Sequence, residues 1–156
     1  MIRGTFEGLG PLTLLGRIKR AAGYGRPLVL RGAKRGLRLR VTPLGVVDPA
    51  PGSEFFQPQR ENRFVSIRVE LVNVGSIGYV DTTSNGARIV DGRGRTLRAA
   101  IIDAAQPGLG RPRLRPGQSK TGTLTFEVPK GVRVRAFRLT LDSGFGPETG
   151  VWALRS

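Results

Sequence analysis

The sequence contains neither cysteine nor histidine, and these two absences exclude most of the familiar catalytic and metal-binding chemistries. Without cysteine there are no disulfides, no thiolate metal ligands and no cysteine nucleophiles. Without histidine there are no histidine–cysteine zinc sites and no serine–histidine–aspartate triads. A carboxylate or lysine mechanism is left in principle, but the sequence offers no pair of carboxylates for it. We therefore expect a protein that is not an enzyme and has no catalytic residue, cofactor or metal.

Long apolar runs are also absent. No stretch is long enough to cross a membrane as a helix. Near the N-terminus, the apolar residues 9–15 are interrupted by Gly10, Pro11 and Thr13. A signal peptide needs an uninterrupted apolar centre and a small-residue cleavage site, so none is apparent here. No amphipathic helix of useful length is found either.

Basic residues outnumber acidic ones in this chain. The 156 residues carry 26 Lys and Arg against 11 Asp and Glu, a formal net charge of +15. More than half of this excess lies in residues 1–40, so the rest of the chain is only moderately basic. Such a charge favours association with nucleic acid, anionic lipid or an acidic polymer. A GC-rich genome would also enrich Arg, Gly and Pro, and the composition leaves both explanations open.

The chain divides into a basic arm and one folded domain. Residues 1–26 mix glycine, leucine and arginine without a regular period, which predicts a loosely ordered N-terminal arm. Residues 27–156 show strand patterns throughout. This length can bury a core without disulfides, so we expect a single domain there.

The clearest strand pattern runs over residues 119–128. Gly122, Leu124, Phe126 and Val128 alternate with three threonines and a glutamate. Strict alternation places every second side chain on the core face of a sheet. Pro116-Gly117 predicts a turn before this strand and Pro129 ends its pairing.

Similar patterns recur along the domain. They predict strands at residues 28–30, 37–47, 64–72, 79–80, 87–90, 96–102, 137–141 and 151–154, the last as an edge strand. Residues 91–94 are a hairpin signal, and residues 103–117 are expected to form a loop. Seven to nine short strands separated by turns predict an all-β fold, an antiparallel β-sandwich of the immunoglobulin type.

Three stretches together carry a family resemblance. They are residues 36–49 (GLRLRVTPLGVVDP), residues 63–75 (RFVSIRVELVNVG), and residues 114–131 continuing to Asp142–Gly146 and Trp152. They resemble the Ig-like domain of unknown function found in secreted proteins and lipoproteins of actinobacteria and other Gram-positive bacteria. That family is related to the immunoprotective extracellular antigen fold of mycobacteria. The resemblance covers roughly residues 27–154.

The resemblance implies an extracellular or cell-surface β-sandwich with no established enzymatic activity and no shared catalytic residues. The chain departs from the family at its N-terminus. There it has a basic arm in place of the usual signal or lipoprotein segment and linker. This departure leaves a cytoplasmic location open beside the extracellular one.

Arginine-rich surfaces supply the candidate contacts with an anionic partner. Arg111, Arg113 and Arg115 alternate in an extended loop, which suits forked hydrogen bonds to phosphate or carboxylate. The remaining candidates are Lys120, which lies nearby, and Arg38 and Arg40, which alternate with core residues in the predicted strand 37–47. For the loop, a merely solvated basic surface is the favoured interpretation.

Two functional hypotheses follow. The first is a non-catalytic binding or scaffolding domain of a bacterial cell-surface or secreted protein, whose partner is a protein or an anionic cell-surface polymer. The alternative is an intracellular basic protein that contacts nucleic acid or another polyanion through its arm and loops. Single-strand binders present exposed aromatic side chains for stacking, for which Tyr24, Phe55, Phe56 and Phe145 are the candidates. Salt-dependent retention on DNA separates the two hypotheses.

Overall fold

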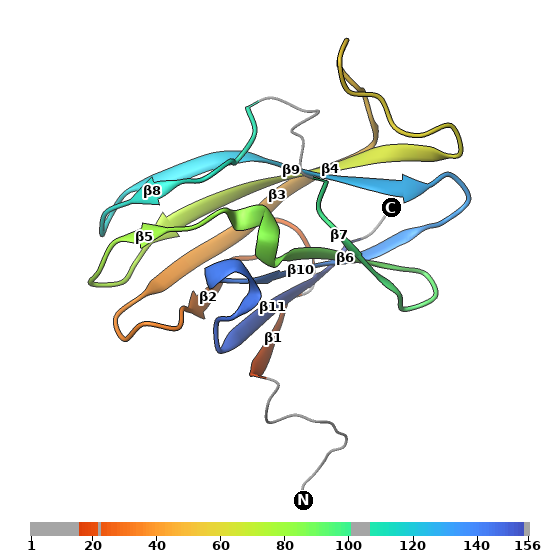
Figure 1. The fold of residues 1–156 in the computed structure, drawn as a ribbon. Helices are drawn as coiled ribbons and strands as arrows, with labels where there is room; N and C mark the ends of the chain where they lie inside the picture. The colour runs from red at the N-terminus through yellow and green to blue at the C-terminus, as the bar shows by residue number, and fades with distance from the viewer. Residues whose placement is uncertain (1–15, 22, 101–106, 155–156) are drawn as a thin grey trace, which may run out of the picture.

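Two β-sheets pack face to face in the computed structural model, which describes residues 16–21, 23–100 and 107–154 (Figure 1). The first sheet has the strand order β1-β11-β10-β6-β7, the second β2-β3-β4-β9, and a small third sheet pairs β5 with β8. The strands are β1 (Arg17–Ala21), β2 (Leu28–Arg31), β3 (Arg38–Ala50), β4 (Asn62–Asn73), β5 (Tyr79–Val80), β6 (Ala87–Asp91), β7 (Thr96–Arg98), β8 (Arg113–Leu114), β9 (Ser119–Pro129), β10 (Val134–Thr140) and β11 (Glu148–Ala153). The described residues also form two short 3₁₀ helices, η1 (Thr83–Gly86) and η2 (Asp142–Gly144). The predicted immunoglobulin-like β-sandwich is therefore confirmed.

The core lies between the two main sheets and is built by alternation. Every second residue of β4, from Val65 to Leu71, is buried against the opposite sheet, as the sequence predicts. On that sheet, Phe137 of β10 stacks on Trp152 of β11 with ring centroids 5.4 Å apart. The Trp152 indole N–H donates to the backbone oxygen of Arg26 at 2.8 Å. The one tryptophan thus closes the core and has its polar atom paired, as a buried indole requires.

Strand β9 forms as predicted, but its second face is less exposed than expected. Gly117 has a φ of +87° and the Gln118 N–H donates to Arg115 O at 2.9 Å, as in the predicted turn. Thr125, expected on the solvent side, is 1% exposed, and its hydroxyl lies 3.0 Å from that of Ser66 on β4. The backbone of residues 99–100 and 107–109 runs along β9, so β9 is not an open edge.

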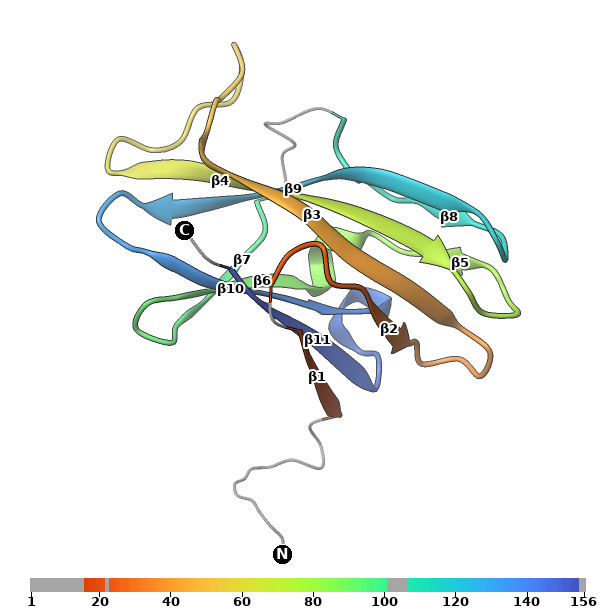
Figure 2. The same ribbon diagram turned by 180° about the vertical axis from the view of Figure 1, so that it is seen from behind.

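The N-terminal strand differs from the prediction of a loosely ordered arm over residues 1–26. Residues 1–15 lie outside the described ranges, but Arg17–Ala21 form β1, which pairs in parallel with β11 (Figure 2). Lys19 Nζ lies 3.2 Å from Glu148 Oε1 and donates to Val29 O at 2.8 Å. β11 is consequently an inner strand and not the predicted edge strand. The sheet begins before residue 27, where the predicted domain starts.

Other strand boundaries also shift. Within the predicted loop 103–117, Arg113–Leu114 form β8 and pair with β5. β3 extends three residues beyond the predicted end at Val47, through a cis Asp48–Pro49 peptide. β7 ends at Arg98, and residues 101–102 of the predicted strand lie outside the described ranges. The two strands that the sequence did not predict, β1 and β8, are short and lack the alternation of the others.

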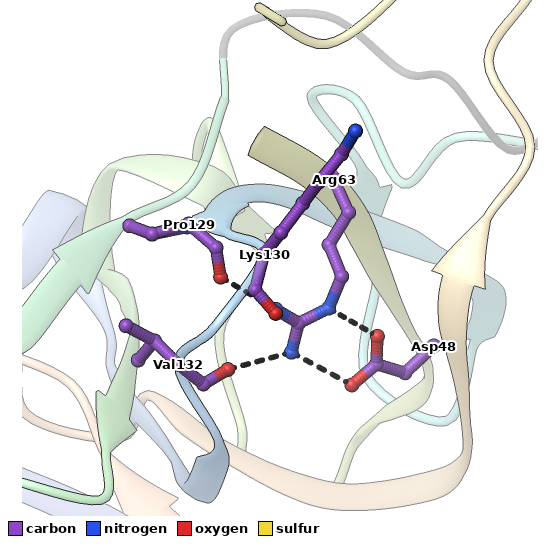
Figure 3. A network of polar contacts seen from close by, with 5 residues as sticks. All are labelled: Asp48, Arg63, Pro129, Lys130 and Val132. Atoms are coloured by element: carbon purple, nitrogen blue, oxygen red, sulfur yellow. Dashed lines mark hydrogen bonds and ion pairs between the residues drawn. The ribbon is translucent and has the colours of Figure 1, made fainter. Parts of the chain in front are cut away.

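Arg63 at the start of β4 holds one end of the sandwich together (Figure 3). Its guanidinium donates to both carboxylate oxygens of Asp48, at 2.6 and 3.1 Å. It also donates to the backbone oxygens of Pro129, Lys130 and Val132, in the turn between β9 and β10. A planar guanidinium can make this forked set of bonds, whereas a lysine cannot. Arg63 therefore links β3, β4 and the β9–β10 turn.

Candidate anion-binding site

Arginines lie in one row across the outer face of the five-stranded sheet. Arg138 of β10 is opposite Arg88 of β6, and Arg88 is opposite Arg98 of β7. On the other side, Val151 of β11 lies between Arg138 and Arg20 of β1. Because neighbouring strands are about 4.8 Å apart, these side chains project at short, regular intervals. We call Arg20, Arg138, Arg88 and Arg98 the arginine row.

The side chains that flank the arginine row are mostly small and uncharged. Its flanking outward positions hold Thr140, Thr149, Ala136, Val90 and Ala153, with the two threonine hydroxyls 2.6 Å apart. Their neighbours along the strands, including Phe137 and Ile89, are buried in the core. No outward position of the described strands β1, β11, β10, β6 and β7 carries an acidic or aromatic residue. The face is therefore cationic.

The arginines of the row repel one another, and no ion pair found in the described ranges joins them to a carboxylate. Like charges directly opposite one another destabilise a sheet. Burial, and then the charges of Arg98 and Arg138, lower the pKa of Arg88 below its ordinary value. The ion pairs found within residues 16–21, 23–100 and 107–154 join other residues: Glu148 with Lys19 and Arg31, Asp48 with Arg63, and Asp91 with Arg95. An anion at this face would relieve the repulsion.

A shallow pocket of about 660 Å³ lies beside the arginine row. Arg88, Arg98, Asn85, Ser143 and Phe145 are among the residues that line it. Arg88 is held in place because its Nη1 donates to the backbone oxygens of Asn85 and of its neighbour in β6, at 3.0 and 2.8 Å. A second hollow of about 400 Å³ continues on the other side of Arg88 towards Arg138. The pocket and the row thus share Arg88 and Arg98.

A tight turn forms one wall of the pocket. Asp142, Ser143 and Gly144 are consecutive residues in the left-handed region, with φ of 55°, 53° and 95°. The first two are not glycine, so this backbone is strained. Asp81 holds it, because Ser143 N and Oγ donate to the Asp81 carboxylate at 2.9 and 2.6 Å. Asp142 in turn accepts from the Ala33 N–H at 2.5 Å.

Asp81 belongs to a buried polar group under the turn. The Tyr79 hydroxyl lies 3.1 Å from that of Thr83 and 3.4 Å from Asp81 Oδ2. Burial, above all, raises the pKa of Tyr79 well beyond its ordinary value, so the phenol stays protonated and can donate. The structural role of Asp81 is to fix Ser143 at the pocket wall.

Three of the described carboxylates are held by basic residues. Asp48 pairs with Arg63, Asp91 accepts from Arg93 and Arg95, and Glu148 accepts from Arg31 and Lys19. Within the described ranges, no group of three or more aspartate and glutamate residues lies close enough to hold a metal ion.

The candidates predicted from the sequence do not form one site. Arg38 and Arg40 are exposed on β3, where Arg38 lies opposite Arg31 of β2. Arg113 is on β8, whereas Lys120 is on β9, which β4 separates from β3. Of the other two, Arg111 donates to the Thr82 hydroxyl at 3.2 Å and the Arg115 N–H donates to the Gln118 side chain at 2.8 Å. No contact found in the described ranges joins any two of these six residues.

The arginine row was missed by sequence reasoning. Arg88 and Arg138 each sit between core positions of predicted strands, so the alternation does place them on the outer face. Their coincidence in one row depends on the pairing of β10 with β6 and of β6 with β7. Alternation within a strand does not say which distant strand is its neighbour, so the pairing of β10 with β6 could not be predicted from it.

The strand order, the two packed sheets and the buried tryptophan define an immunoglobulin-like β-sandwich. A model of the family described as a domain of unknown function (DUF4352) matches residues 37–149, so the chain belongs to this family. The resemblance to an Ig-like domain of unknown function, stated from the sequence, is thus confirmed. A search of curated proteins found no match.

Solved structures with the same fold come from several bacteria. MPT63, a secreted protein from Mycobacterium tuberculosis, superposes with a TM-score of 0.64 and 12% identity, covering 86% of this chain and 96% of MPT63. A candidate lipoprotein from Bacillus subtilis, ycdA, gives a TM-score of 0.62 and 15% identity over 82% of this chain and 38% of ycdA. The yjhA protein from Bacillus subtilis gives 0.58 and 13% over 86% of this chain and 100% of yjhA. These TM-scores show a shared fold.

In the ranges that the structure describes, no helix has the length and apolar character needed to cross a membrane.

Proposed function

We propose that this protein is a non-catalytic binding domain that acts at a bacterial cell surface or after secretion, and that the arginine row contacts an anionic partner. The location is supported by fold neighbours described as a secreted protein of a mycobacterium and a lipoprotein of a bacillus. The absence of histidine and cysteine from the chain, and the absence of a metal-binding group of acidic residues from its described part, support a non-catalytic role.

The observation that carries the proposal is the register of Arg138, Arg88 and Arg98 on adjacent strands. Three guanidinium groups at strand spacing, without a neighbouring carboxylate on their face, suit successive anionic groups of an extended polymer. Guanidinium groups bind carboxylate, sulfate and phosphate through forked hydrogen bonds. A partner of this kind would supply the negative charge that the face lacks.

Nucleic acid, the alternative partner, is less well supported on this face. Single-strand binders combine a cationic groove with aromatic side chains on which bases stack. Tyr24, Phe55, Phe56 and Phe145 are exposed, as predicted. However, Tyr24 follows β1, and Phe55 and Phe56 lie in the loop between β3 and β4, so of these four only Phe145 lines the pocket with Arg88 and Arg98. One aromatic side chain does not provide a series of stacking surfaces, so the row favours a polymer recognised mainly through charge.

The test compares two double variants that remove the same charge from opposite sheets. Retention on immobilised heparin, a sulfated polysaccharide, is measured against salt for the natural chain, for Arg88→Gln with Arg138→Gln, and for Arg38→Gln with Arg40→Gln. We expect the first variant to lose about tenfold or more in affinity and the second to lose little. Equal losses from both variants would contradict the proposal. Tighter binding to DNA than to heparin at the same salt would support the alternative.

A further inference from the structure

We propose that the pocket beside the arginine row binds one acidic sugar unit, a hydroxylated ring that carries a carboxylate or a phosphate. This proposal rests on the proposed function and deepens it, because it names the chemical unit that the anionic partner would present. The pocket shares Arg88 with the row, so a unit bound there can belong to a longer chain lying across the face.

The anionic group is recognised by Arg88 and Arg98. The two are directly opposite in the pairing of β6 with β7, and both line the pocket. Hydrogen bonds to backbone oxygens occupy Nη1 of Arg88, while its Nε and Nη2 have no acceptor among the described residues. A guanidinium anchored in this way offers its free edge to an oxyanion at a low cost in side-chain entropy.

Hydroxyl groups of the ring are recognised by Asn85, Ser84 and Ser143. Asn85 Nδ2 donates to Ser143 Oγ at 3.3 Å, and Ser143 Oγ donates to Asp81 at 2.6 Å. This chain of bonds leaves Asn85 Oδ1 as an acceptor without a partner in the described part of the chain. Asn85 lines the same pocket as Arg88 and Arg98, and this combination suits a molecule that is both anionic and rich in O–H donors. A bare phosphate or sulfate would leave this acceptor unused.

The ring itself is recognised by Phe145. Its side chain is 87% exposed, and Gly144 separates it from the strained residues Asp142 and Ser143. Strained backbone reduces stability, and such strain clusters where binding requires it. At the pocket rim, Phe145 provides the apolar surface on which one face of a sugar ring can pack.

The experiment measures binding of glucuronic acid, glucose 6-phosphate and glucose to the full chain by calorimetry. We expect one or both acidic sugars to bind and glucose to bind at least tenfold more weakly. Preference between the two acids identifies carboxylate or phosphate as the natural group. Absence of binding by both acids, or equal binding of glucose, would overturn the proposal.

Variants locate the site. Phe145→Ala and Asn85→Ala are each expected to weaken binding of the preferred acid by about fivefold or more. Phe55→Ala removes a phenylalanine that is 81% exposed in a distant loop and serves as the matched control, with no change expected. Melting curves confirm that each variant folds, and Arg98→Gln gives an independent test of the anionic contact. Equal effects of Phe55→Ala and Phe145→Ala would overturn the assignment to this pocket.

The two proposals fail in different ways. If heparin retention depends on Arg88 and Arg138 but neither acidic sugar binds, only the pocket proposal is wrong. If heparin retention is insensitive to the arginine row, the proposed function is wrong, whatever the sugars do.

Discussion

Arg63 connects three segments of the chain through one side chain. It is 16% exposed, and its forked bonds to Asp48 and to the β9–β10 turn use donors on all three guanidinium nitrogens. Removing such a group loses bonds that are stronger than neutral hydrogen bonds, because a charged guanidinium donates them.

We expect Arg63→Lys to lower the free energy of unfolding by about 2–3 kcal/mol, because an ammonium cannot reproduce the fork. Urea unfolding measures this change. Arg68→Lys, on the exposed face of the same strand, is the control and should change stability by less than about 0.5 kcal/mol. A lysine at position 63 that matched the stability of the natural chain would show that the fork is dispensable.

Glu148 links β11 to β1 and β2 and predicts a dependence of stability on pH. Burial raises the pKa of this carboxyl, but hydrogen bonds from the Arg31 N–H, Lys19 and the Arg31 guanidinium outweigh it and hold the pKa below 4.5, the ordinary value. A group whose pKa is lower in the folded state stabilises the fold above its unfolded pKa. That stabilisation is lost as the pH falls through the folded value.

The free energy of unfolding should therefore fall as the pH drops below 4.5, and Glu148→Gln should flatten this part of the profile. Chemical denaturation at a series of pH values measures the slope. Glu54→Gln, at an exposed loop position, is the control and should leave the slope as it is. An unchanged profile in Glu148→Gln would assign the acid sensitivity to other carboxylates.

At the scale of the elements, β1 is where sequence and structure differ most. The longer strands could be predicted because each shows alternation over at least five residues between turn signals, as in β4 and β9. β1 has five residues, three of them basic, and its partner β11 lies at the other end of the chain. Its stabilising contacts, such as Lys19 with Glu148, are long-range, and a local pattern does not contain them.

The amides of β1 and β11 that pair in the sheet should exchange with solvent more slowly than those of the exposed loop at residues 53–57. The Arg17 N–H, which donates to Pro147 O at 2.8 Å, is the first of them. Hydrogen–deuterium exchange read by mass spectrometry measures the difference. Exchange in residues 17–21 as fast as in that loop would restore the interpretation of the whole segment as a loose arm.

At the scale of the whole molecule, the two sheets present different outer faces. That of the four-stranded sheet is partly covered, since Ser66 and Thr125 are buried. The outer face of the five-stranded sheet carries the arginine row. Sequence analysis identified the family and the sandwich, because those depend on strand patterns. The candidates it named, among them Arg38 and Arg40, come from arginines close together in the sequence, whereas the arginine row combines residues of strands that only the fold brings together.

The central claim is that the outer face of the five-stranded sheet binds anionic polymer. Its most direct test is a titration of isotopically labelled protein with a heparin oligosaccharide, followed by amide chemical shifts in NMR. The account predicts that the largest shifts fall on β10, β6 and β7, at and beside Arg138, Arg88 and Arg98. Shifts confined to β3 and residues 111–115, around Arg38, Arg40 and Arg113, would contradict it.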